Sequence, residues 1–146
     1  MVLGDEIMKT KVLNIAVIEH NGKILMRKKP NGSLPYKETW YSFGGEVKDG
    51  ITPEEAAKEI VKLQTGIDIK LKNNLSWDTE IKEDLDGETK QFIYLDSLYE
   101  YVDGKLSIGE GQNIEKLEWI PIEELKNYDI VPPSVILYKK LGYLKD

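Results

Sequence analysis

The sequence predicts an α/β (α+β) fold in which a central mixed β-sheet lies between helices. Short β-branched and aromatic segments stand on both sides of one amphipathic helix pattern, and two further helix patterns follow near the C-terminus. At 146 residues the chain has the length of one domain that can bury a sizeable core. We therefore expect a single domain over residues 1–146, with a flexible leader in residues 1–10.

Composition and charge narrow the class of protein. Charged residues make up 32% of the chain and hydrophobic residues 40%, which is typical of a soluble globular protein. The chain has no cysteine, which excludes disulfides and thiol nucleophiles and favours the cytoplasm. No apolar run approaches the length of a membrane span, and no signal-peptide pattern is present. The net charge of −6 makes nucleic acid an unlikely partner, because such partners require a basic face.

The first part of the chain reads as a hairpin, a loop and a short strand. Asn21-Gly22 is a strong hairpin signal between two apolar segments. Pro30 and Pro35 mark a loop. The predicted segments are strands at residues 11–19 (KVLNIAVIE) and 23–27 (KILMR), a loop at 28–39, and a brief strand at 40–43 (WYSF) that ends at Gly44-Gly45.

A helix is predicted from Pro53 to the residue before Gly66. Thr52 is a suitable N-cap, Pro53 suits the first helical position, and Glu55 stands three residues after the cap, where a capping box needs it. Gly66 allows the left-handed backbone with which many helices end.

The second part of the chain reads as strands followed by two helices. Asp86-Gly87 predicts a turn, Pro132-Pro133 predicts a break, and Ser134 is expected to cap the last helix. The predicted segments are strands at 67–71, 75–81, 89–102 and 116–120, a loop at 107–113, a short helix from Pro121, and a final helix to about Leu144.

The stretch from Gly44 to Ile67, GGEVKDGITPEEAAKEIVKLQTGI, resembles the Nudix box, G-x5-E-x7-R-E-U-x-E-E-x-G-U, in which U is apolar. Gly45 and Gly66 have the glycine spacing of the box, and Val61 and Ile67 occupy its two apolar positions. The resemblance extends to the hairpin, the Trp before Gly-Gly and the late LEWIPIEEL segment. It implies a Nudix-like (MutT-like) α/β/α sandwich and a hydrolase of nucleoside diphosphates linked to another group.

The acidic residues of the box motif are replaced by other residues in this chain. Ile51 stands at the first Glu and Glu59 at the Arg. The three glutamate positions of the helix carry Ile60, Leu63 and Gln64. A register shifted by one residue brings Glu59 to one glutamate position, but it requires two gaps and does not restore the glutamate pair.

In the family, the box glutamates hold divalent cations against the diphosphate of the substrate, so the resemblance alone implies Mg²⁺ or Mn²⁺. Mg²⁺ prefers oxygen ligands, and glutamates at i, i+3 and i+4 share one helix face. Two alkyl groups and an amide cannot make that site. We expect Ala56, Ile60, Leu63 and Ile67 to pack in the core; the alternative is an apolar ligand pocket.

Other carboxylates could replace the missing ligands. The candidates for metal binding are Glu46 and Glu59, with Asp49 also in the loop after the glycines. The candidates for catalysis are Glu59 and Glu110, the latter in the second loop, where some family members carry a base. For each of these residues the alternative is an exposed surface charge.

Basic and aromatic residues near the loops are candidates for binding a nucleotide. Arg27 and Lys29 could contact phosphates, and Trp40 could pack near a base. Gly44 and Gly45 could bring backbone N–H groups to a phosphate. The alternative is that Trp40 belongs to the core and the basic side chains are surface charges.

Two functions follow from these observations. The first is a Nudix-fold protein that retains a nucleotide-like ligand or a protein partner and has lost most hydrolysis. The second is an active pyrophosphohydrolase that uses Glu46, Glu59 and Glu110. A homodimer is compatible with either, because dimers are frequent in the family.

Overall fold

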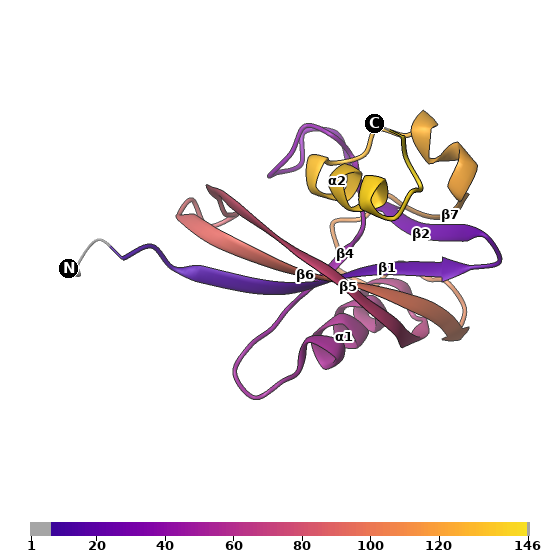
Figure 1. The fold of residues 1–146 in the computed structure, drawn as a ribbon, viewed down its shortest axis with the longest axis horizontal. Coiled ribbons are helices and arrows are strands. Elements are labelled where there is room, and N and C mark those ends of the chain that lie inside the picture. The colour runs from indigo at the N-terminus through magenta and orange to yellow at the C-terminus, as the bar shows by residue number, and fades with distance from the viewer. Residues whose placement is uncertain (1–6, 146) are drawn as a thin grey trace.

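The computed structural model describes residues 7–145, which form a seven-stranded mixed sheet with a helix on each side (Figure 1). The strand order is β3-β2-β1-β6-β5, with β4 paired to β1 and β7 paired to β2. The strands are β1 (Thr10–His20), β2 (Lys23–Lys28), β3 (Trp40–Tyr41), β4 (Phe43–Glu46), β5 (Asp68–Glu83), β6 (Thr89–Asp103) and β7 (Lys116–Pro121). The helices are α1 (Pro53–Thr65), the 3-10 helix η1 (Ile122–Asn127) and α2 (Pro132–Lys140).

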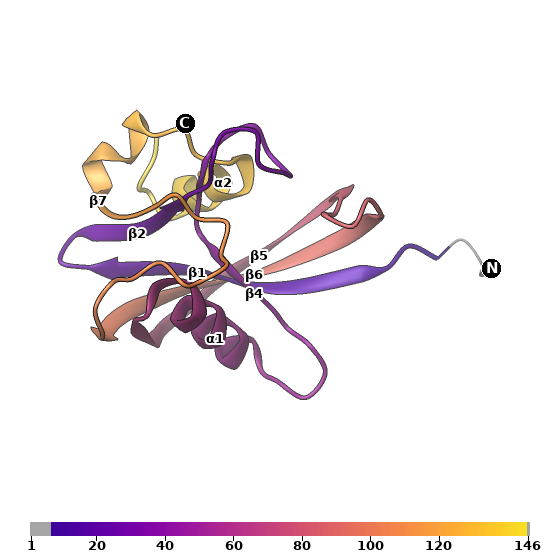
Figure 2. The same cartoon turned by 180° about the vertical axis from the view of Figure 1, so that it is seen from behind.

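The helices lie on opposite faces of the sheet, as Figures 1 and 2 show. One core cluster joins α1 to residues such as Ile18, Phe43 and Tyr99. A second core cluster, which includes Met26, Trp40 and residues of α2, fills the other face. The predicted α/β/α arrangement around a central sheet is therefore confirmed.

Strand β1 organises the sheet around the site. It runs parallel to β6 from Thr10 to Glu19, and its other edge is shared by two partners. The first partner is β4, which pairs with Leu13 to Ala16, and the second is β2, which pairs with the end of β1. Gly44 and Gly45 therefore lie beside β1, on the strand that packs against α1.

The box helix forms as the sequence predicts. Glu55 N–H donates to the Thr52 hydroxyl at 3.1 Å, and the Thr52 N–H donates to the Glu55 carboxylate at 2.9 Å. Pro53 occupies the first turn, and Gly66 ends the helix with φ at 78°. Both ends of α1 are therefore fixed by local sequence.

Two predictions about strands are wrong. The segments predicted at 67–71 and 75–81 form one continuous strand, β5, which absorbs the intervening polar residues as β-bulges between Leu71 and Ser76. The segment predicted at 40–43 divides at Ser42 into β3 and β4, because β3 pairs with β2 and β4 pairs with β1.

The last helix also differs from the prediction. It begins directly with Pro132-Pro133, which suit a first turn, so Pro132 does not break the chain before it. Val131 is the N-cap, and the Ser134 hydroxyl instead lies 2.8 Å from the Ser42 hydroxyl. The helix ends at Lys140 and not near Leu144.

The N-terminal prediction is only partly covered by the structure. Strand β1 already begins at Thr10, inside the expected leader, while residues 1–6 lie outside the described residues. Within residues 7–145, no helix is long and apolar enough to span a membrane.

Candidate functional site

Gly45 allows helix α1 to lie close against the sheet. A Cβ placed on Gly45 would lie 2.2 Å from the backbone oxygen of Ala56, so only glycine allows this approach. Gly44, the preceding residue, would meet only the side-chain ends of Ile15 and Leu13, at 3.1 and 3.3 Å. Gly45 therefore sets the distance between α1 and β4.

An open hollow lies where α1, β4 and the loop between them meet, and we call it the box cleft. Its lining includes Gly44, Gly45, Glu46, Glu59, Ile60 and Leu63. The core prediction holds for Ala56 and Ile67, which are buried, and Ile60 is half-buried. It is wrong for Leu63, which is 56% exposed and lines the cleft. The loop of residues 107–113 docks instead on the neighbouring Gln64.

Gln64, at the third replaced glutamate position, forms hydrogen bonds with the loop of residues 107–113. Its side-chain amide donates to the Gln112 Oε1 at 3.2 Å, and its backbone oxygen accepts from Gly109 N–H at 3.1 Å. A Cβ on Gly109 would lie 2.0 Å from the Leu63 oxygen. The loop of residues 107–113 is therefore docked tightly on the C-terminal end of α1.

The candidate carboxylates do not converge. Glu46, Asp49 and Glu59 line the box cleft, and Glu46 lies 3.8 Å from Lys11. Glu110 is exposed in the loop of residues 107–113 and does not line the cleft. Within residues 7–145, no group of three His, Cys, Asp or Glu side chains could hold a metal ion. The described residues therefore do not fit a Mg²⁺ ion held mainly by protein carboxylates.

A second hollow adjoins the box cleft, and we call it the aromatic–cation cavity. The two share Lys11, Leu13 and Gly44 in their linings. The side chains that give the aromatic–cation cavity its character are Arg27, Lys29, Tyr36, Tyr41, Lys82 and Tyr94. The predicted phosphate-binding residues Arg27 and Lys29 are thus brought together in one cavity with Gly44.

Arg27 and Lys29 lie in this cavity without a carboxylate partner. Arg27 Nε donates to the Ser42 backbone oxygen at 3.0 Å, and its guanidinium carbon lies 5.3 Å from the centroid of the Tyr41 ring. The Lys29 ammonium lies 4.5 Å from the same centroid. Within residues 7–145, neither cation has a carboxylate oxygen within 4.0 Å.

The surroundings of these cations lower their affinity for protons. Burial lowers the pKa of Arg27 to about 10. Burial and the neighbouring charges of Arg27 and Lys82 lower the pKa of Lys29 to about 8. Both pKa shifts mean that no nearby negative charge offsets the cost of burying these positive charges. A bound anion would therefore stabilise the charged forms of Arg27 and Lys29.

Three side chains that line the cavity, those of Tyr36, Lys82 and Tyr94, belong to one polar network. The Glu80 Oε1 accepts hydrogen bonds from the Tyr36 and Tyr94 hydroxyls, each at 2.6 Å. The Lys82 ammonium donates to the same hydroxyls at 2.8 and 3.0 Å. This network ties the loop of residues 29–39 to β5 and aims Lys82 at the cavity.

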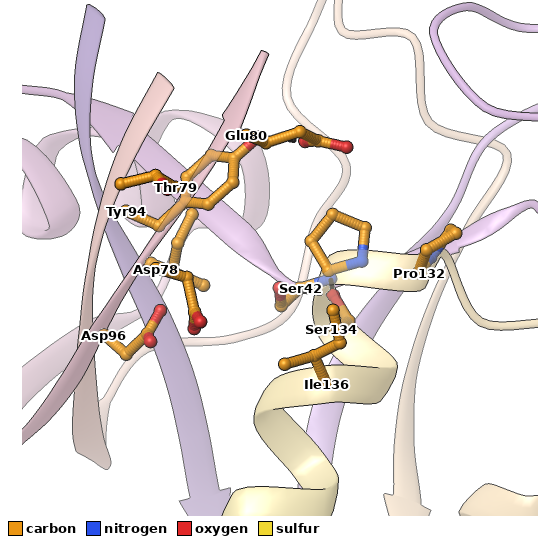
Figure 3. A pocket seen from close by; sticks show the side chains of 11 residues that line it. Ser42, Asp78, Thr79, Glu80, Tyr94, Asp96, Pro132, Ser134 and Ile136 are labelled. Atoms are coloured by element: carbon orange, nitrogen blue, oxygen red, sulfur yellow. Dashed lines mark hydrogen bonds between the residues drawn. The ribbon is translucent and has the colours of Figure 1, made fainter. Parts of the chain in front are cut away.

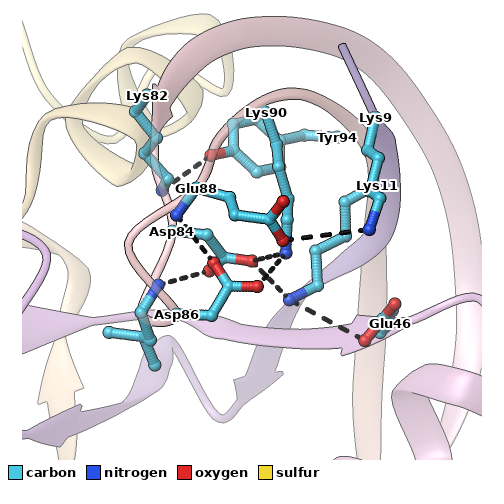
Figure 4. Close-up of polar contacts among 10 residues, drawn as sticks. Lys9, Lys11, Glu46, Lys82, Asp84, Asp86, Glu88, Lys90 and Tyr94 are labelled. Carbon is cyan, nitrogen blue, oxygen red and sulfur yellow. Dashed lines mark hydrogen bonds and ion pairs between the residues drawn. The ribbon is translucent and has the colours of Figure 1, made fainter. Parts of the chain in front are cut away.

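Charged residues also fix the rim of the cavity (Figure 4). The Lys11 ammonium donates to Asp84 at 2.9 Å, and Lys90 donates to Asp84 and Asp86 at 2.9 and 2.8 Å. The turn between β5 and β6 is therefore held against β1, at the border between the cavity and the box cleft.

Trp40 and Tyr41 point to opposite faces of β3. Trp40 is 7% exposed and packs in the core, with its ring 5.0 Å from that of Tyr128 in an edge-on arrangement. Trp40 therefore packs in the core, which was the alternative interpretation, and does not line the cavity. Tyr41 is 6% exposed and lines the cavity, and its buried hydroxyl has no hydrogen-bond partner among the described residues.

Sequence reasoning missed the residues that β5 and β6 contribute. Glu80 and Lys82 occupy alternate positions of β5, so they share one face of the sheet, and Asp84 directly follows the strand. This alternation was present in the sequence as a signal. The position of these three residues beside Arg27 depends on the tertiary pairing of β5 with β6. The sequence alone does not show that position.

Comparisons with known proteins agree with this architecture. Curated relatives include the "Nucleoside triphosphatase NudI" of Klebsiella pneumoniae (strain 342), 24% identical over 143 residues that cover 94% of this chain and all of the relative. Another is the NudI protein of Enterobacter sp. (strain 638), 20% identical over 141 residues with the same coverage.

Solved structures show the same fold. The solution structure of the E. coli ORF135 protein has a TM-score of 0.70 at 21% identity and covers 99% of this chain and 96% of its own. The crystal structure of a MutT NUDIX hydrolase from Burkholderia pseudomallei has a TM-score of 0.69 at 20% identity, with 91% and 98% coverage. The family model for the NUDIX domain matches residues 8–141. The chain therefore belongs to the NUDIX domain family.

Proposed function

We propose that this protein binds a nucleotide-like ligand and has lost most or all Mg²⁺-dependent hydrolysis. The observation that carries the proposal is the helix face toward the box cleft. Ile60 and Leu63 line the cleft at glutamate positions of the box, and the Gln64 amide is bound to Gln112. Alkyl groups cannot ligate Mg²⁺, so the helix supplies no carboxylate at these positions.

The neighbouring cavity supports the binding part of the proposal. Arg27 and Lys29 are cations that lack carboxylate partners among the described residues, and the Tyr41 hydroxyl is buried in the same cavity. Buried charges and buried polar groups are costly unless they are paired. A phosphate that accepted hydrogen bonds from all three would satisfy them, while tyrosine rings could contact a base or sugar.

The names of the relatives support the class of ligand. The NudI proteins are named nucleoside triphosphatases, and the alignments span nearly the whole of this chain. We therefore propose a nucleotide in place of an unrelated anion. The site would comprise Arg27, Lys29, Gly44 and Gly45, with Tyr41 in the role expected of Trp40.

The alternative function is an active pyrophosphohydrolase. It is favoured by one observation, the presence of Glu46, Asp49 and Glu59 in the lining of the box cleft. In this alternative Glu46 and Glu59 would hold the metal together with substrate phosphates. Glu110 lies outside the cleft lining, so it would need to approach before acting as a base.

A turnover assay distinguishes the two functions. Purified protein would be incubated with nucleoside triphosphates, nucleoside diphosphate sugars and dinucleoside polyphosphates, with Mg²⁺, with Mn²⁺ and with EDTA. We expect no turnover that depends on the metal. Turnover that EDTA stops, and that Glu46→Gln or Glu59→Gln abolishes, would overturn the proposal in favour of the alternative.

A further inference from the structure

Strand β5 forms a free edge of the sheet (Figure 1). It pairs with β6, and within residues 7–145 no other strand pairs with it. At 16 residues it is also the longest strand of the sheet. A free edge presents backbone N–H and C=O groups without partners, and another chain can add a strand to it.

The two halves of this edge differ in how they are protected. In the first half, β-bulges interrupt the ladder between Leu71 and Asn73 and between Asn74 and Ser76. Bulges of this kind twist an edge away from strand pairing. The second half, residues 77–83, pairs with β6 in regular register. The second half of the edge is therefore open to a further strand.

The register of the hairpin shows which backbone groups face the free edge. Asp84 N–H donates to the Glu88 oxygen at 2.8 Å. Bonded and non-bonded pairs alternate in an antiparallel ladder, so every second residue before Asp84 also bonds to β6. The residues between them, which turn N–H and C=O outward, are Thr79, Ile81 and Glu83. One step earlier, the Trp77 oxygen accepts from the Lys140 ammonium at 3.5 Å, so the free segment begins after Trp77.

The side chains of this segment alternate between two faces of the sheet (Figure 3). Asp78 and Glu80 extend toward α2, and Thr79 extends away from it. On the face of Thr79, Ile81 is 64% exposed and Trp77 is 69% exposed. Natural proteins usually protect an open edge with charges or bulges, so exposed apolar side chains on a regular edge indicate an interaction surface.

We propose that a second copy of this chain pairs with this segment, β5 against β5, in antiparallel direction around a twofold axis at Ile81. The two sheets then form one continuous sheet. The interface is isologous, because both copies use the same residues. This inference concerns assembly and does not rest on the proposed function.

The charges of the segment favour a second copy in this register. With Ile81 opposite the partner's Ile81, Glu80 lies opposite the partner's Lys82, and Lys82 lies opposite the partner's Glu80. Opposite charges on directly facing residues stabilise a strand pair, and like charges destabilise it. A twofold axis at Thr79 would instead place Asp78 opposite Glu80, and an axis at Glu80 would place this carboxylate opposite itself. Only the axis at Ile81 pairs Glu80 with a cation.

The ends of the segment are compatible with this register. Asp78 comes opposite the partner's Asp84, but each of these carboxylates already has a cation within its own copy. Asp78 is paired with Lys140, and Asp84 is paired with Lys11 and Lys90. Repulsion between the two carboxylates is therefore offset before the copies meet.

The length of the segment predicts a weak dimer. Residues 79–83 span roughly 17 Å and supply about six backbone hydrogen bonds across the axis. A contact of this length buries less surface than the roughly 1,200 Å² at which stable interfaces begin. We therefore expect a dissociation constant of about 10–100 µM.

The first test is analytical ultracentrifugation of the full chain from roughly 5 µM to roughly 500 µM. Wild type should change from monomer to dimer across this range. Ile81→Lys places two like charges across the axis and should weaken the dimer at least tenfold. Val102→Lys is the matched control, because Val102 is 53% exposed on β6 and lies outside the segment. It should dimerise as wild type does.

The second test is disulfide cross-linking, which reads the register directly. The chain has no cysteine, so a single introduced cysteine can only link two copies. Cα atoms of a bonded antiparallel pair lie roughly 5.5 Å apart, within the range that a disulfide spans. Ile81→Cys should therefore form a covalent dimer on mild oxidation. Thr79→Cys, on the same face, should not, because its two copies would lie roughly 13 Å apart along the strands.

Amide hydrogen exchange locates the contact within the dimer. In wild type, exchange of the Thr79 and Glu83 amides should slow as the protein concentration rises. A chain that stays monomeric, a dimer that Ile81→Lys leaves intact, or a covalent dimer from Thr79→Cys and not from Ile81→Cys would overturn this inference. Each of these results leaves the proposed function standing, because nucleotide binding and turnover are measured separately.

Discussion

The Gln64 side-chain amide donates to Gln112 Oε1 at 3.2 Å and ties the last turn of α1 to the loop of residues 107–113. Gln64, which stands at a glutamate position of the box motif, thus connects the helix to a loop. The Gly109 contact with the Leu63 oxygen strengthens the same connection, because no side chain would fit there. The end of the helix is therefore held by close contacts with this loop.

Gln112→Ala should lower the free energy of unfolding by about 1 kcal/mol, because it removes the partner of a part-buried amide. Nucleotide affinity should not change, since Gln112 lines neither the aromatic–cation cavity nor the box cleft. Urea unfolding measures the first quantity and calorimetry the second. Gln91→Ala, at an exposed position, is the control. Unchanged stability in Gln112→Ala would show that the amide contact contributes nothing.

Gly45→Ala should destabilise the protein by about 2 kcal/mol or more, because its Cβ would lie 2.2 Å from a backbone oxygen of α1. Gly44→Ala is the matched control. Its Cβ would meet only the flexible ends of Ile15 and Leu13, so a smaller loss is expected. Thermal and urea unfolding of the two variants should rank them in this order. The reverse order would mean that the helix can move away from β4 at little cost.

Lys29→Met should weaken nucleotide binding roughly tenfold or more, because it removes one charged donor to the phosphate. In the wild type, the Lys29 pKa of about 8 means that the charge is present below pH 8 and lost above it. The phosphate contribution to affinity should therefore fall as the pH rises through that value.

Lys28→Met provides the matched control for Lys29→Met. The Lys28 ammonium lies 2.6 Å from the Glu115 carboxylate, away from the cavity. Calorimetry with a nucleotide should show wild-type affinity for this variant. A similar loss in both variants would indicate a general charge effect and would remove Lys29 from the site.

Asp96→Asn should raise the free energy of unfolding at pH 8 by about 1–3 kcal/mol. The folded-state pKa of about 7 lies above the unfolded value, so the folded protein binds the proton more tightly. The wild type should therefore lose stability as the pH rises from about 4 to about 7. Urea unfolding at pH 5 and pH 8 checks the sign, with Asp68→Asn as the control. Equal free energies of unfolding for Asp96→Asn and wild type at pH 8 would contradict the raised pKa of Asp96.

The parts of the fold that depend on local sequence were predictable. The caps of α1 are a Thr, a Pro and a Gly at fixed offsets, and the structure contains each as expected. The bulged path of β5 was not predictable, because pairing with β6 holds its polar residues in a strand. Secondary structure that tertiary pairing imposes leaves no local signal.

In the candidate site, too, some features were predictable from local sequence and others depend on tertiary structure. Arg27 and Lys29 stand on alternate positions of one chain segment, so their shared cavity could be anticipated from the strand period. The same period separates Trp40 from Tyr41 and should have favoured Tyr41 as the cavity residue. The carboxyl groups of Asp78 and Asp96 lie on the two strands of the β5–β6 hairpin, and their proximity depends on a register that the β-bulges of β5 shift.

The central claim is that the site holds a nucleotide without hydrolysing it, and phosphorus NMR tests this most directly. Protein would be mixed with a slight excess of cytidine 5′-triphosphate in Mg²⁺ buffer, and the spectrum followed for a day before and after EDTA is added. We predict bound, intact triphosphate signals that persist, that shift on binding, and that lose this shift in Lys29→Met. Conversion to monophosphate and pyrophosphate that stops on addition of EDTA would contradict the account.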